Sequence, residues 1–148
     1  MNATAAHAGQ LDKGGQPYIH HPIHVSKVAM EIVRSRPGYD EAFCCQVGIV
    51  GFLHDILEDT KMTAEDFRKA GIPEEYIVAV QILTKDKTES YEKYLDKVSH
   101  NKLAAVVKIV DMTHNCDLSR LQEVTPEDLK RAEKYKKAIK YKIICTTN

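Results

Sequence analysis

The segment GFLHDILEDT combines an apolar run with a histidine and three carboxylates, His54, Asp55, Glu58 and Asp59. An unpaired charge in an apolar setting is costly, so four ionisable groups in such a run need a cation or one another. At helical spacing, Asp55 is three residues from Glu58 and four from Asp59. We therefore expect all four side chains to lean toward one side of a helix over residues 40–59.

Two interpretations of this polar cluster are open. In the first, His54 and Asp55 are a metal-binding pair, and Glu58 and Asp59, one turn later, are an acid/base pair. In the second, the cluster is an exposed polar stripe near the end of a helix. Carboxylates at a helix C-terminus oppose the helix dipole, which mildly disfavours the second interpretation.

Apolar residues recur at helical spacing along nearly the whole chain, and no segment shows the alternation that is typical of a strand. Start and stop residues divide this pattern, among them Pro22, Pro37-Gly38, Thr63, Ser90 and Asn101. We expect helices over residues 20–33, 40–59, 63–71, 73–83, 90–100, 101–118 and 125–143. The sequence thus predicts one all-α domain over residues 1–148, a compact bundle of about six to eight helices.

Composition excludes several classes of function. The chain has 148 residues, enough to bury a core, and its 21 basic side chains are balanced by 21 acidic ones. No basic field is present to attract nucleic acid, and no apolar stretch approaches the roughly 20 residues that span a bilayer. The first ten residues do not resemble a secretory signal, and the four cysteines show no CxxC spacing. We expect a cytoplasmic protein with reduced thiols that binds neither nucleic acid nor membranes.

Two distant segments carry further metal-ligand residue types. In PYIHHP, prolines on both sides of His20 and His21 stiffen the backbone just before a helix. Asp111 ends the apolar run 106–110, where a carboxylate is costly unless it is neutralised. Considered alone, a single histidine is usually structural, and Asp111 is best interpreted as an ordinary boundary residue of an amphipathic helix.

Considered together, His21, His54, Asp55 and Asp111 offer two imidazoles and two carboxylates. Mixed nitrogen and oxygen ligands suit a divalent ion such as Mn²⁺, Fe²⁺ or Zn²⁺ better than a soft thiolate site would. Open coordination positions would accept water and a phosphate oxygen, and the ion would lower the pKa of that water. The set therefore favours hydrolysis of a phosphorylated small molecule.

Three ordered blocks, AHAGQLDKGGQPYIHHP, LHDILEDT and VKIVDMTHN, resemble the HD superfamily of metal-dependent phosphohydrolases. Within it, the chain is most similar to the hydrolase domain of RelA/SpoT-type alarmone enzymes, in particular to small stand-alone members. The resemblance implies removal of the 3′-pyrophosphate of guanosine tetra- or pentaphosphate by a metal-activated water. It implies Mn²⁺ as the ion and assigns these roles: ligands His21, His54, Asp55 and Asp111; catalytic residues Glu58 and Asp59; substrate-binding residues Lys13 and Asn115.

The chain departs from the family pattern on the side that would recognise the base. The family has an arginine, expected to stack on guanine, where this sequence has Asp12, and it often has a basic residue where this sequence has Asp117. An aspartate cannot stack as a cation does, and it repels an anionic ligand. A broader nucleotide phosphatase and a non-catalytic nucleotide sensor therefore stay open as alternatives. The sequence also leaves open the oligomeric state and the ion used in the cell.

Overall fold

The computed structural model describes residues 20–115, 125–127, 129–130 and 133. Within these ranges every regular element is helical, which confirms the predicted all-α class. The helices are α2 (His20–Arg34), α3 (Glu41–Leu53), α4 (Ile56–Asp59), α5 (Ala64–Lys69), α6 (Glu74–Leu83), α7 (Tyr91–Ser99) and α8 (Lys102–Asn115). None of them combines the length and the apolar character that crossing a membrane requires. The predicted last helix lies mostly outside the described residues.

Side chains cap several of these helices as the sequence predicts. Thr63 and Asp66 form a reciprocal capping box at the start of α5, and the Ser90 side chain accepts a hydrogen bond from the Lys93 backbone at the start of α7. Asn101 Oδ1 accepts from the Ala104 backbone N–H at 3.0 Å and so caps α8. These caps satisfy N–H groups that a helix start would otherwise leave without partners.

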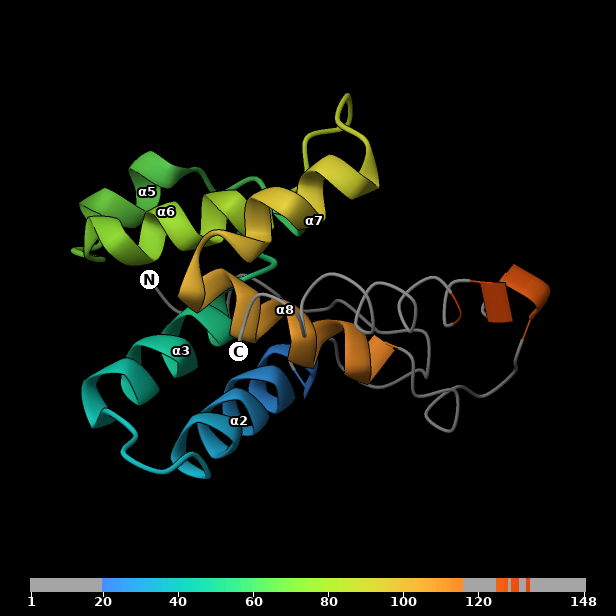
Figure 1. The fold of residues 1–148 in the computed structure, drawn as a ribbon. Helices are drawn as coiled ribbons and strands as arrows, with labels where there is room; N and C mark the ends of the chain where they lie inside the picture. Colours follow the sequence, from blue (N-terminus) through green and yellow to red (C-terminus); the bar gives the residue numbers. More distant parts are fainter. Residues whose placement is uncertain (1–19, 116–124, 128, 131–132, 134–148) are drawn as a thin grey trace.

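The helices share a single core, with α8 lying between the α2–α3 pair and the layer that contains α6 and α7 (Figure 1). Each described helix contributes at least one fully buried side chain: Val25, Val47, Ile56, Phe67, Ile77, Val98 and Val107. Because α8 contacts α2, α3, α6 and α7, its residues can meet side chains from both ends of the described segment.

The predicted continuous helix over residues 40–59 is wrong, because α3 ends at Leu53 and α4 begins only at Ile56. A physical cause lies at Gly51, whose carbonyl would accept the backbone N–H of Asp55 in an uninterrupted helix. Instead, the imidazole Nδ1 of His54 lies 2.6 Å from that oxygen. The break places His54 and Asp55 in a turn. Ile49, on the outer side of α3, is 41% exposed.

Two glycines of α3 allow α2 to pack closely against it. A Cβ built on Gly51 would lie 3.1 Å from the Cα of Ser26, and a Cβ on Gly48 would lie 2.5 Å from the Met30 sulfur. The Ser26 hydroxyl donates a hydrogen bond to the Gly48 carbonyl at 2.7 Å across this interface. The close approach matters for the site, because α2 carries His21 and α3 leads into His54.

Candidate metal centre

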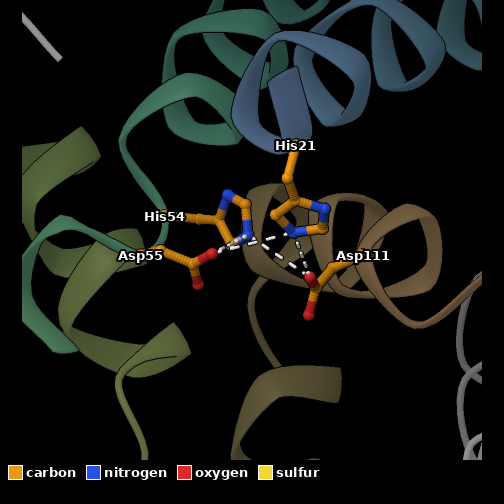
Figure 2. A group of neighbouring side chains, drawn as sticks. All are labelled: His21, His54, Asp55 and Asp111. Atoms are coloured by element: carbon orange, nitrogen blue, oxygen red, sulfur yellow. Dashed lines mark hydrogen bonds and ion pairs between the residues drawn. The ribbon is translucent and has the colours of Figure 1, made fainter. Parts of the chain in front are cut away.

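His21, His54, Asp55 and Asp111 converge from three segments of the chain (Figure 2). One ligand atom from each residue can be chosen so that all four lie within 4.8 Å of one another. His21 comes from the first turn of α2, the next two residues from the α3–α4 turn, and Asp111 from α8. His21, His54 and Asp111 are only 4%, 3% and 5% exposed. The structure thus brings together the four residues that the sequence grouped as ligands.

The imidazole of His54 is oriented by the backbone and presents a bare nitrogen to the cluster. Its Nδ1 donates to the Gly51 carbonyl, so the hydrogen of a neutral ring resides on Nδ1 and the lone pair on Nε2. Among the described side chains, His54 Nε2 is the buried polar atom without a hydrogen bond. Asp55 Oδ2 is close, at 3.1 Å, but the contact lacks hydrogen-bond geometry. A buried lone pair of this kind is suited to a metal ion.

His21 meets α8 through both of its ring nitrogens. Its Nε2 lies 2.8 Å from Asp111 Oδ1 and 3.7 Å from Asp55 Oδ2. Its Nδ1 lies 2.7 Å from Nδ1 of His114, whose ring stacks in turn on His24. The Nε2 atoms of both imidazole ligands therefore face the carboxylates, as a shared cation would require.

Asp111 uses its two carboxylate oxygens differently. Oδ1 faces the cluster and also accepts a hydrogen bond from Asn115 Nδ2 at 3.1 Å. Oδ2 accepts from Lys108 Nζ at 2.9 Å. The Lys108 side chain is 14% exposed, and its ammonium lies 5.3 Å from the ring centroid of Tyr94, within the range of a cation–π contact.

The electrostatics of the cluster favour a cation. Burial favours neutral His54, but the carboxylates of Asp55 and Asp111 outweigh it and raise the pKa of His54 well above its usual value. Burial favours protonated Asp111, yet Lys108 and the two imidazoles hold the pKa of Asp111 well below the usual range. Burial would raise the pKa of Asp55, but the neighbouring His54 outweighs this effect and lowers the pKa. Two ionised carboxylates beside two imidazoles attract either protons or a metal ion.

The donor set fits a divalent metal. Two imidazole nitrogens and two carboxylate oxygens suit Mn²⁺, Fe²⁺ and Zn²⁺. The bare Nε2 of His54 and the paired negative charge of Asp55 and Asp111 are both accounted for by a cation among them.

The remaining predicted residues lie around this cluster or outside the described part of the chain. Glu58 and Asp59 are exposed on α4, one turn after Asp55. Desolvation by neighbouring protein groups, followed by the charges of Asp55 and Asp59, raises the pKa of Glu58. Asn115 contacts Asp111, a partner that the resemblance did not imply. Lys13 lies outside the described residues.

Sequence reasoning assigned no role at the metal centre to Lys108, Tyr94 or His114. Lys108 had a usable signal, because it is a lysine within the apolar run of α8 and lies three residues before Asp111 on the same helical face. His114 carries the same signal three residues after Asp111. Tyr94 had none, because its place beside Lys108 depends on the packing of α7 against α8.

The helical fold and the His/Asp cluster around the adjacent His54 and Asp55 agree with the predicted resemblance to HD-type domains, and comparison with known proteins specifies the relatives. The chain is 30% identical over 144 residues to a probable guanosine-3′,5′-bis(diphosphate) 3′-pyrophosphohydrolase of Synechocystis. It is 26% identical over 144 residues to the guanosine-3′,5′-bis(diphosphate) 3′-pyrophosphohydrolase of Haemophilus influenzae. Each match covers 90% of this chain, which spans 17% and 20% of the length of those relatives. No protein-family model matches the chain.

A solved structure of a metazoan ortholog of SpoT, described as hydrolysing ppGpp, has the same fold. Its TM-score is 0.69 at 23% sequence identity, and the match covers 97% of this chain and 86% of that one. A further relative is the bifunctional (p)ppGpp synthase/hydrolase SpoT of Escherichia coli, 26% identical over 139 residues, or 87% of this chain and 18% of that protein. These matches confirm the predicted resemblance to the hydrolase domain of RelA/SpoT-type proteins.

Proposed function

We propose that this chain is a metal-dependent phosphohydrolase that removes the 3′-pyrophosphate of guanosine tetra- or pentaphosphate. One observation carries the proposal. His21, His54, Asp55 and Asp111 form one largely buried group in a chain that is similar to named 3′-pyrophosphohydrolases. Hydrolysis consumes one water and gives pyrophosphate with GDP from the tetraphosphate or GTP from the pentaphosphate. The core shared by helices α2 to α8 supports one domain for the described residues, and we propose that this domain spans residues 1–148.

The four clustered residues would hold the ion, with His21 and His54 binding through Nε2 and Asp111 through Oδ1. Mn²⁺ is the proposed ion, and the donor set also suits Fe²⁺ or Zn²⁺. When bound, such an ion supplies a Lewis acid for the phosphoryl oxygen and lowers the pKa of a coordinated water.

Glu58 and Asp59 are proposed to move protons during hydrolysis. They follow Asp55 by one turn and are solvent-exposed, so a water can lie between them and the cluster. The raised pKa of Glu58 suits a group that takes a proton from the attacking water and passes it to the 3′-oxygen of the departing GDP or GTP. Lys13 is proposed to meet a phosphate and Asn115 to bind the nucleoside. The proposed partner is this small nucleotide in the cytoplasm, with no role for nucleic acid or a membrane.

A broader nucleotide phosphatase is a second candidate, favoured by Asp12 and Asp117 on the side expected to recognise the base. Incubation of Mn²⁺-loaded protein with guanosine tetraphosphate, GTP and other nucleotides, followed by separate assays of pyrophosphate and phosphate, distinguishes the candidates. Pyrophosphate released from guanosine tetraphosphate alone supports the main proposal. Phosphate released from many nucleotides supports the second candidate. Tight binding of guanosine tetraphosphate without turnover contradicts both and indicates a sensor.

A further inference from the structure

His114 contacts the ring edge of His21 that lies opposite the carboxylates. The two Nδ1 atoms are 2.7 Å apart, and the rings are nearly parallel, with 10° between their planes. A neutral imidazole has one N–H, so in a hydrogen bond between two ring nitrogens one donates and the other accepts. The contact therefore has a direction, which depends on the hydrogen of each ring.

The chemistry of the proposed metal site fixes that direction. Nε2 of His21 faces the carboxylates, 2.8 Å from Asp111 Oδ1, so this nitrogen is the one available to a metal ion. A nitrogen that gives its lone pair to a metal carries no hydrogen, so the hydrogen of His21 is on Nδ1. Nδ1 of His21 then donates, Nδ1 of His114 accepts, and the hydrogen of His114 is on its Nε2.

We propose that His114 is a positioning residue of the metal centre, whose Nδ1 accepts the hydrogen bond that directs Nε2 of His21 toward the ion. This inference rests on the proposed metal site. Histidine ligands commonly donate their second N–H to a carboxylate, a backbone carbonyl or water. His54 follows that pattern through the Gly51 carbonyl, whereas His21 uses a second imidazole.

The position of His114 on α8 supports this role. It lies three residues after Asp111 on one face of the helix, so α8 holds the His21 ring at both nitrogens. On its other side, the ring of His114 stacks on His24, with centroids 4.0 Å apart. A ring packed between two others is restricted in orientation, as a residue that positions a ligand must be.

The test compares His114→Asn with His114→Leu, two variants whose side chains have the same branched arrangement of four heavy atoms. Asn places an amide oxygen near the former Nδ1 and can accept the hydrogen bond, whereas Leu cannot. At pH 8 we expect His114→Leu to bind Mn²⁺ about 10–100-fold more weakly than the parent. A loss of this size is typical when a metal ligand loses its hydrogen-bond partner. We expect His114→Asn to stay close to the parent. His24→Leu, which removes the outer stacking partner and leaves His114 in place, should change the affinity less than His114→Leu does.

A second measurement needs no variant and so does not depend on folding of the substituted chains. In Zn²⁺-loaded parent protein with ¹⁵N-labelled histidine, we expect NMR to show the hydrogen of His21 on Nδ1 and that of His114 on Nε2. The opposite pair of tautomers overturns the inference, as does equal Mn²⁺ affinity of the parent and a folded His114→Leu. If the parent binds no Mn²⁺, the metal site and the inference both fail. If the parent binds Mn²⁺ but does not hydrolyse guanosine tetraphosphate, only the proposed function fails.

Discussion

The ammonium group of Lys108 lies 2.9 Å from Oδ2 of Asp111, while Oδ1 of the same carboxylate faces the imidazoles of His21 and His54. Burial disfavours a charged lysine, but Asp111 and the nearby tyrosine Tyr94 outweigh it and raise the pKa of Lys108 well above its usual value. Lys108 therefore stays charged, and it neutralises part of the negative charge of the cluster in metal-free protein.

Replacement of this lysine should destabilise the metal-free protein. We expect Lys108→Met to lower the free energy of unfolding by about 3 kcal/mol, near the low end for a broken buried ion pair. The low end applies because Asn115 and His21 still contact Asp111 in the variant. Urea denaturation in the presence of a chelator measures the change.

Lys108→Arg is the matched control, because it keeps the charge beside Asp111. It should lose less stability than Lys108→Met, and Mn²⁺ should restore part of the loss in the Met variant. A Met variant as stable as the parent would mean that Asp111 does not depend on Lys108.

The proposed role of Glu58 predicts a loss of rate without a loss of metal. Glu58→Gln should retain bound Mn²⁺ and lower kcat by about 10²–10⁴-fold, the usual size of an acid/base contribution. Metal content by elemental analysis and turnover of guanosine tetraphosphate are the two measurements. Full activity in the Gln variant would show that another group handles the proton.

Metal removal should lower stability but leave the protein folded. The core contains buried residues from every described helix, and the four clustered residues contact one another without a metal. We expect the helical circular dichroism signal to survive chelation. Mn²⁺ at a hundred times its dissociation constant should add about 2.7 kcal/mol to the free energy of unfolding.

Asp55→Ala provides the control for that measurement, because it removes one proposed ligand from a position that is not in the core. It should retain neither Mn²⁺ nor hydrolase activity, and its thermal midpoint should not respond to Mn²⁺. A shift as large as that of the parent would place the bound ion elsewhere.

The spacing of α2 and α3 predicts an effect of Gly51, whose carbonyl contacts His54, on the metal site. Gly51→Ala would bring a methyl group 3.1 Å from the Cα of Ser26, and backbone cannot move aside as a side chain can. We expect a loss of about 1–3 kcal/mol in stability from overpacking, with weaker Mn²⁺ binding as α2 and its His21 shift. Denaturation and metal titration measure the two effects.

Gly48→Ala is the matched substitution one turn earlier in α3. Its methyl group would meet the Met30 side chain, which is flexible and can change rotamer. The cost should therefore be smaller, and Mn²⁺ affinity should stay close to that of the parent. Equal effects of the two substitutions would show that the geometry of the site does not depend on the spacing of α2 and α3.

Local signals were sufficient to predict most of the fold. The side chains of Thr63, Ser90 and Asn101 mark helix starts because capping is a short-range interaction, and the structure has helices at those places. The break before Ile56 was not predictable in this way. It coincides with a side chain that binds the carbonyl of Gly51, and helical periodicity continues across it in the sequence.

The four clustered residues of the candidate site were predictable from the sequence, but the residues that contact and orient them were not. His21, His54, Asp55 and Asp111 stood out because polar residues in costly positions suggest a common partner. Lys108 and His114 share a helical face with Asp111, but the contacts of Lys108 with Tyr94 and of His114 with His21 depend on how α8 packs against α7 and α2. Helix packing is a long-range property, which the spacing of residues in one helix does not determine.

The pairing of His21 with Asp111 joins residues that are 90 positions apart in the chain. An ion can find its full set of donors only after α2, the α3–α4 turn and α8 have docked, so partly assembled chains offer it two or three donors at most. The ion would therefore bind late in folding. It would stabilise the fully docked arrangement selectively over any conformer in which α8 has not yet packed against α2 and α3.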